Sequence, residues 1–171
     1  EWILQPLLSW NNYPKESHMT YRYTTKENSI INSAIKILKY RVCESECMSS
    51  TKDVKQYCQL AIANEPDEWF CCMFLNNQHQ LITFEKLFRG TVDHANVHPR
   101  VILRRALELN SAALILVHNH PSGSTTPSTS DINITKKLTT LLSEIDVRVL
   151  DHLIVSTSTV TSMADLSLLP A

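Results

Sequence analysis

A short apolar run that ends in two histidines constrains the fold of this chain more than any other part of its sequence. Residues 112–117 are typical of a buried β-strand, and the letters HNHP follow them directly. A turn-rich loop, residues 121–127, comes next. Ser128 and Asp131 then match the N-cap and the first turn of a helix. The sequence therefore predicts a strand, a loop and a helix in this order, with polar side chains at both junctions.

These polar side chains form a candidate metal site. Successive side chains of an extended strand point to opposite faces, so His118 and His120 should share one face while Asn119 turns away. The helix that begins at Ser128 would fold the carboxylate of Asp131 back toward the histidines. An isolated H-x-H pair is usually only the polar end of a strand, but the full pattern favours a metal. Two imidazoles and a carboxylate suit zinc, and they leave a fourth position for water, as in catalytic sites.

The amino-acid sequence of this segment also resembles that of a known family. The pattern H-x-H-P-x(6)-S-x(2)-D is similar to the signature of the JAMM (MPN+) metalloproteases, and HNHPSGSTTPSTSD resembles their bacterial RadC branch. Four further segments are similar to RadC sequences in the expected order: LFRGT (87–91), VHPR (97–100), ELNSAALILV (108–117) and VRVLDHLIV (147–155). The resemblance extends over roughly residues 31–165.

The resemblance implies a fold, a metal and a type of reaction. It implies an α/β fold with a single MPN (JAB/JAMM)-type domain, whose mixed central sheet is flanked by helices, similar to the cytidine-deaminase-like architecture. It implies one zinc ion per chain, bound by His118, His120 and Asp131. The reaction would be hydrolysis of a peptide or isopeptide bond in a peptide or protein substrate. The serine that matches Ser128 would stabilise the oxyanion.

The general base is expected to be a glutamate that is distant in sequence from the histidines. In JAMM enzymes it stands at the start of an early strand, and Glu68 occupies the matching place before the apolar residues 69–75. A carboxylate beside such a strand would be partly desolvated, which suits a group that takes a proton from zinc-polarised water and passes it to the leaving amine. Glu85, at the end of the next expected strand, is the rival candidate.

A second function remains open at this point. The name RadC carries an association with DNA repair, so the chain could be a DNA-repair or mobile-element accessory protein that acts by binding, with a structural or silent zinc site. RadC relatives usually carry a helix-hairpin-helix for DNA contact, and residues 1–50 lack its glycine-bearing hairpin. The 16 basic and 17 acidic residues give no charge excess of the kind that nucleic-acid binders usually show. We therefore expect any contact with DNA or with a repair protein to be local.

The organisation of the chain is expected to be simple. With 171 residues, of which 43% are hydrophobic, one core is favoured over two small ones. We expect a poorly ordered N-terminal arm (1–29), a helical lead-in (30–65) and the MPN/JAMM domain (66–171). Two helices should occupy the lead-in, the second beginning at residues 50–53.

Within the MPN/JAMM domain the expected elements follow from local patterns. Periodicity and turn residues predict a hairpin (69–75 and 81–85), a helix (99–109), the histidine strand and its following helix, and strands at 147–156 and 160–163. The helix that begins at Ser128 should carry one largely apolar face. That face is expected to include Ile132, Thr135, Leu138, Leu142 and Ile145.

Other residues favour a cytoplasmic protein without a membrane segment. No apolar run approaches the 18 or so residues of a membrane span, and the first residues do not resemble a secretory signal. The five cysteines are expected to be reduced, and Cys71 and Cys72 to be buried. His152 stands in an apolar strand, so we interpret it as a structural histidine outside the metal set.

Overall fold

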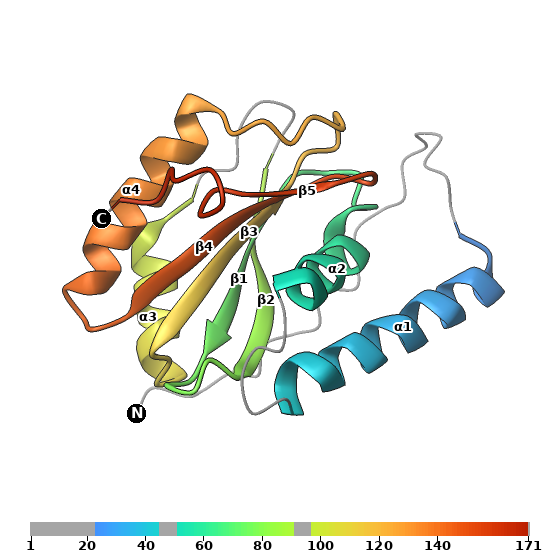
Figure 1. Cartoon of the computed structure of the whole chain (residues 1–171), viewed down its shortest axis with the longest axis horizontal. Coiled ribbons are helices and arrows are strands. Elements are labelled where there is room, and N and C mark those ends of the chain that lie inside the picture. Colours follow the sequence, from blue (N-terminus) through green and yellow to red (C-terminus); the bar gives the residue numbers. More distant parts are fainter. Residues whose placement is uncertain (1–22, 45–50, 91–96, 171) are drawn as a thin grey trace, which may run out of the picture.

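The computed structural model describes residues 23–44, 51–90 and 97–170, which form a mixed five-stranded sheet covered by helices on both faces (Figure 1). The strands lie in the order β2-β1-β3-β4-β5. Their bounds are β1 (Trp69–Leu75), β2 (Leu81–Arg89), β3 (Ala113–Asn119), β4 (Arg148–Val155) and β5 (Val160–Ser162). The helices are α1 (Thr25–Glu44), α2 (Thr51–Ile62), α3 (Pro99–Glu108) and α4 (Thr129–Ser143).

The sheet mixes antiparallel and parallel pairs. β1 and β2 form an antiparallel hairpin, and β1 also pairs antiparallel with β3. β3 runs parallel to β4, and α4 makes the crossover between them. A parallel pair needs such a crossover, because its strands begin at the same edge of the sheet. The architecture is the mixed α/β sheet that was expected from the sequence.

Two apolar cores lie on opposite faces of this sheet. Figure 1 shows α3 and α4 over one face and α1 and α2 over the other. Along β1, Cys71 and Met73 contribute to the core beneath α1 and α2, whereas Cys72 and Phe74 contribute to the core beneath α3 and α4. Because both faces are covered, β1 and β3 are continuous apolar runs rather than alternating ones.

The expected helices and strands agree with the structure, with differences at their ends. β2 continues beyond Glu85 to Arg89, and β3 includes His118 and Asn119. α1 begins at Thr25, so residues 25–29 are helical rather than part of the expected arm. A reciprocal cap explains this start, since Glu27 accepts hydrogen bonds from the backbone and hydroxyl groups of Thr24. The rest of the expected arm, residues 1–22, lies outside the described residues.

One expected position on α4 was wrong. Ile132 was expected to share a face with Thr135, Leu138 and Leu142, but its side chain is 36% exposed, whereas those three side chains are buried. The inward position in the first turn of the helix belongs to Asp131 instead. A polar residue occupies it because this turn contributes to the candidate metal site rather than to the apolar core.

Among the described helices, none combines the length and the apolar character that a membrane crossing requires. The apolar side chains of the described region are instead concentrated in the two cores that flank the sheet.

We expect the cost of truncating a leucine to follow its burial in the core beneath α3 and α4. Leu116 lies in the middle strand and is fully buried, so Leu116→Ala should lower the free energy of unfolding by about 2–5 kcal/mol. Leu107 on α3 is 61% exposed, and Leu107→Ala is the matched control, with an expected change within about 0.5 kcal/mol. Urea denaturation followed by circular dichroism measures both, and equal losses would contradict this assignment of the core.

Candidate metal centre

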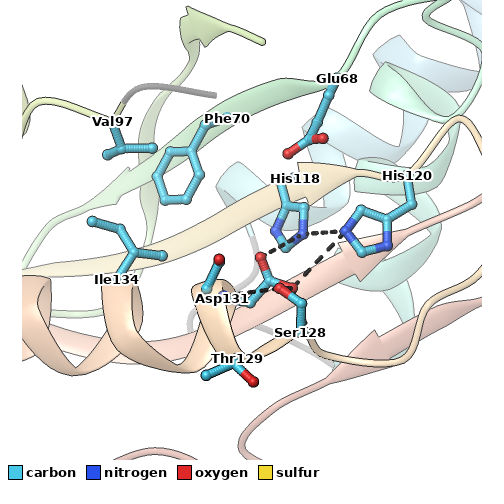
Figure 2. A pocket seen from close by; sticks show the side chains of 10 residues that line it. Glu68, Phe70, Val97, His118, His120, Ser128, Thr129, Asp131 and Ile134 are labelled. Atoms are coloured by element: carbon cyan, nitrogen blue, oxygen red, sulfur yellow. Dashed lines mark hydrogen bonds and ion pairs between the residues drawn. The ribbon is translucent and has the colours of Figure 1, made fainter. Parts of the chain in front are cut away.

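The five side chains predicted to form a site line one hollow at the end of β3. This hollow has a volume of about 530 Å³ and lies between the start of β1, the end of β3 and the first turn of α4. Figure 2 shows the histidines and Asp131 close together, with Glu68 above them. The predicted residues on its lining are His118, His120, Asp131, Ser128 and Glu68.

Three potential metal ligands converge there. The Nε2 atoms of His118 and His120 are 2.8 Å apart. Asp131 places Oδ1 3.3 Å from Nε2 of His118 and Oδ2 4.0 Å from Nε2 of His120. These three residues are the cluster in the described part of the chain whose ligand atoms could hold a metal ion. The shared face of the two histidines follows from the two-residue period of the strand.

The position of Asp131 is fixed by the start of α4. Ser128 is the N-cap residue, and its hydroxyl oxygen accepts a hydrogen bond from the backbone N–H of Asp131. In return, Oδ2 of Asp131 accepts hydrogen bonds of 2.7 Å from both the backbone N–H and the hydroxyl of Ser128. This capping box turns the other oxygen, Oδ1, toward His118.

Both histidines are held through their second ring nitrogen. Nδ1 of His120 lies 2.6 Å from the carbonyl oxygen of Ser124, which can only accept, so Nδ1 carries the hydrogen. Nδ1 of His118 lies 2.8 Å from Nε2 of His152. The His118 side chain is 1% exposed, and burial lowers its pKa to about 4, with the Asp131 carboxylate opposing this shift and His120 adding to it.

His152 is buried as expected, but it is not isolated in the core. Its Nδ1 lies 2.6 Å from the hydroxyl oxygen of Thr135, and that hydroxyl donates to the carbonyl oxygen of Asp131 at 2.5 Å. Burial lowers the pKa of His152 well below its usual value, and His118 and His120 lower it further. The contact between His152 and His118 was missed from the sequence, although the similarity of VRVLDHLIV to RadC sequences marked the position.

The structure separates the two candidate bases. Glu68 lines the hollow, and Figure 2 shows its carboxylate directed toward the two histidines. Glu85 lies opposite Cys72 on β2, where Arg105 of α3 binds its carboxylate with contacts of 2.7–3.0 Å. Glu85 is thus part of an ion pair away from the metal ligands, and Glu68 is the candidate that the fold brings to them.

Asn119 turns away from the site, as expected, and connects it to the start of β1. Its side-chain oxygen accepts a 2.8 Å hydrogen bond from the backbone N–H of Trp69, and its amide donates to the carbonyl oxygen of Asp67 at 2.9 Å. Gly90 donates its N–H to the carbonyl oxygen of Glu68 at 2.7 Å. These bonds fix the backbone on both sides of Glu68, so the residue between the two histidines also positions the candidate base.

The donor set fits a zinc ion. Two imidazole nitrogens and one carboxylate oxygen are ligands that zinc accepts, and the hollow leaves an open side. In a tetrahedral arrangement with zinc–nitrogen bonds of about 2.0–2.1 Å, the two nitrogens would be about 3.3 Å apart. The observed 2.8 Å therefore requires the rings to separate by about half an ångström.

The described cysteines are no competitors for the metal. Cys58, Cys71 and Cys72 are free and fully buried. Burial raises the pKa of the Cys71 thiol to about 12, which disfavours the thiolate that metal binding requires. Cys43 and Cys47, four apart in sequence, could share a helical face and bind a metal, but their side chains lie outside the described residues.

Comparison with protein families agrees with this geometry. The sequence profile described as "RadC-like JAB domain" matches residues 48–168. The chain belongs to the RadC-like JAB domain family. The match includes every residue of the candidate site and all described strands, whereas α1 precedes it.

This RadC-like JAB domain is also similar in sequence to individual bacterial proteins. The chain is 45% identical to a UPF0758 protein of Methylibium petroleiphilum over 141 residues, which are 82% of this chain and 64% of that protein. It is 44% identical to a UPF0758 protein of Vibrio cholerae over 79% of this chain and 85% of the relative. It is also 48% identical to one from Pseudomonas syringae pv. tomato over 71% of this chain, but only 54% of that protein. The chain therefore spans only part of some relatives.

The buried histidines predict how the stability of the metal-free RadC-like JAB domain depends on pH. The pKa of His118 is about 4 in the folded protein and about 6.5 in an unfolded chain, so the unfolded state binds more protons in between. The free energy of unfolding should therefore fall as the pH is lowered from about 7 toward 5. Urea denaturation at each pH, with a chelator present, measures this free energy of unfolding.

The matched control for this pH dependence uses an exposed histidine. His118→Gln should weaken the dependence, with buried His152 supplying what remains, whereas His98→Gln, which changes an exposed side chain, should leave it as it is. A free energy of unfolding that stays constant or rises between pH 7 and pH 5 would contradict the assignment.

Asn119 provides a further prediction. Asn119→Ala removes the partners of two backbone groups beside Glu68, so the free energy of unfolding should fall by about 1–3 kcal/mol. The exposed Asn133 on α4 is the control, and Asn133→Ala should change it by less than about 0.5 kcal/mol. Equal stability of the two variants in urea would show that Asn119 does not fix the start of β1.

Proposed function

We propose that this protein is a zinc-dependent metallohydrolase of the JAMM type that cleaves a peptide or isopeptide bond. The observation that carries the proposal is the convergence of two imidazole nitrogens and a carboxylate on one hollow, with a second carboxylate, that of Glu68, on the same lining. A metal with an open side and a nearby base is the combination that metal-assisted hydrolysis requires. Membership of the JAB domain family supports the same reaction class.

His118, His120 and Asp131 would hold the zinc ion. When bound, zinc would polarise a water molecule and lower its pKa to about 7. Glu68 would take a proton from that water molecule and pass it to the nitrogen of the leaving group. Its backbone is fixed by the bonds at Trp69 and Gly90, which would limit the movement of the carboxylate during these transfers.

Ser128 would stabilise the oxyanion of the reaction by a hydrogen bond. In the structure its hydroxyl donates to Oδ2 of Asp131, so this hydrogen must turn away from Asp131 to reach the substrate. The rotation leaves Oδ2 with the backbone N–H of Ser128 as a partner. The capping box therefore permits the proposed role without leaving the carboxylate unpaired.

The proposed substrate is a peptide or protein in the bacterial cytoplasm. Reduced thiols at Cys58, Cys71 and Cys72 agree with a reducing compartment. The balance of 16 basic and 17 acidic residues favours this reading over a DNA-associated accessory protein, because it supplies no excess charge for the phosphate backbone. A local association with DNA or with a repair protein remains the second candidate.

The test combines zinc analysis with a peptide-cleavage assay. We expect about one zinc ion per chain in the purified protein and cleavage of a mixed peptide pool followed by mass spectrometry. His118→Ala should lose both the metal and the cleavage. Glu68→Gln should keep the metal and lower the cleavage rate by roughly 100-fold or more, because a general base contributes that much.

Glu85→Gln is the matched control, since it changes the same type of side chain outside the hollow. This variant should retain both zinc and cleavage. Metal-free wild-type protein would overturn the hydrolase proposal and favour the accessory protein. Full cleavage by Glu68→Gln would remove Glu68 from the mechanism while leaving the zinc site in place.

A further inference from the structure

A buried chain of hydrogen bonds runs from the second ring nitrogen of His118 into the core. It passes from His118 to His152, then to the hydroxyl of Thr135, and ends at the backbone carbonyl of Asp131. His152 and Thr135 are both 0% exposed. Since no solvent reaches these groups, protein atoms must satisfy their donors and acceptors. The Thr135 hydroxyl also lies 3.7 Å from the sulfur of Met163, which is a weak acceptor and has no hydrogen to give.

The direction of this chain follows from counting hydrogens, beginning at Asp131. A carbonyl oxygen has no hydrogen, so the 2.5 Å contact between it and Oγ1 of Thr135 requires the single hydroxyl hydrogen of Thr135 to lie between the two oxygens. That hydroxyl then has no hydrogen left to donate to His152. The 2.6 Å contact between Oγ1 and Nδ1 of His152 therefore requires the hydrogen to be on Nδ1.

The same count of hydrogens determines which ring nitrogen of His118 is protonated. A neutral imidazole carries one hydrogen, so Nε2 of His152 presents a lone pair. The 2.8 Å contact between this atom and Nδ1 of His118 then requires a hydrogen on Nδ1 of His118. Nε2 of His118, which faces His120 and Asp131, is left with its lone pair.

His120 has the same tautomer as His118, and a different hydrogen bond determines it. Its Nδ1 donates to the carbonyl oxygen of Ser124, so its Nε2 also presents a lone pair. Two acceptor atoms thus face each other at 2.8 Å beside the carboxylate of Asp131, with no hydrogen between them. This arrangement is repulsive by itself and becomes favourable when a cation binds to both nitrogens.

We propose that His152 is a positioning residue of the metal site, which holds His118 in the Nδ1–H tautomer through the chain anchored by Thr135 and the Asp131 carbonyl. The inference rests on the zinc site of the proposed function and deepens it. His152 binds no metal itself. An apolar side chain at position 152 could fill the same space, but it would leave Nδ1 of His118 without an acceptor.

The first experiment measures the tautomers directly. Two-bond nitrogen–proton correlation spectra of the metal-free, ¹⁵N-labelled protein distinguish a hydrogen on Nδ1 from one on Nε2. We expect His118, His120 and His152 to carry the hydrogen on Nδ1. A hydrogen on Nε2 of His118 overturns the proposal, whatever the protein does with zinc.

The second experiment uses a matched pair at Thr135. Thr135→Val keeps the shape of the side chain but removes the hydroxyl, so nothing holds the hydrogen of His152 on Nδ1. We expect its zinc affinity, measured by competition with a chelator, to fall roughly 10- to 100-fold. Thr135→Ser keeps the hydroxyl and should retain the wild-type affinity. Unchanged affinity in a folded Thr135→Val variant overturns the proposal.

A third comparison concerns His152 itself. His152→Gln can present an oxygen acceptor where Nε2 of the imidazole lies, whereas His152→Leu cannot. We expect the glutamine variant to bind zinc more tightly than the leucine variant and to give a cobalt visible spectrum closer to that of the wild type. Equal zinc affinities and spectra in the two variants contradict a role through hydrogen bonding.

These results are separable from the fate of the proposed function. The tautomer is read in the absence of metal, and zinc affinity needs no turnover. Normal zinc binding with the expected tautomers but no cleavage of any peptide would overturn the hydrolase and leave the positioning role in place. Wild-type protein that binds no zinc would overturn both. If a variant at Thr135 or His152 fails to fold, the wild-type spectra still decide the proposal.

Discussion

The pairing of β3 on both edges and its burial on both faces is the constraint on which the rest of the site depends. The strand ends in polar residues, and His118 and Asn119 are 1% exposed, so each needs a partner from the protein. The partners come from different parts of the fold: Asp131 of α4, His152 of β4, and the backbone at the start of β1. The hydrogen-bond partners that these buried side chains require therefore determine where α4, β4 and the start of β1 lie.

Much of the candidate site could be predicted because its rules are local. The two-residue period of a strand places His118 and His120 on one face, and the capping box places Asp131 at the start of a helix. These signals lie within a short stretch of the chain and depend on no distant contact. For the same reason, the apolar runs of β1 and β3 indicated buried strands, whereas the helices on both faces of the sheet were implied by the family resemblance.

The remainder depends on contacts between residues that are far apart in sequence. Whether Glu68 or Glu85 faces the metal ligands is decided by the pairing of β1 with β2 and by Arg105 on α3, neither of which a local pattern encodes. The contact of His152 with His118 likewise follows from the parallel register of β3 and β4. Ile132 was misplaced because apolar periodicity does not reveal that Asp131 takes the inward position in the first turn.

Asp131 lies at both ends of one closed circuit. Its carboxylate approaches Nε2 of His118, while its backbone carbonyl receives the hydrogen bond that leads back through Thr135 and His152 to the same ring. The ligands are therefore preorganised: their rotamers are set by packing and hydrogen bonds before an ion arrives, so little conformational entropy remains to be lost on binding. The circuit also makes the first turn of α4 and the end of β3 a single mechanical unit, in which a shift of the helix would displace two ligands together.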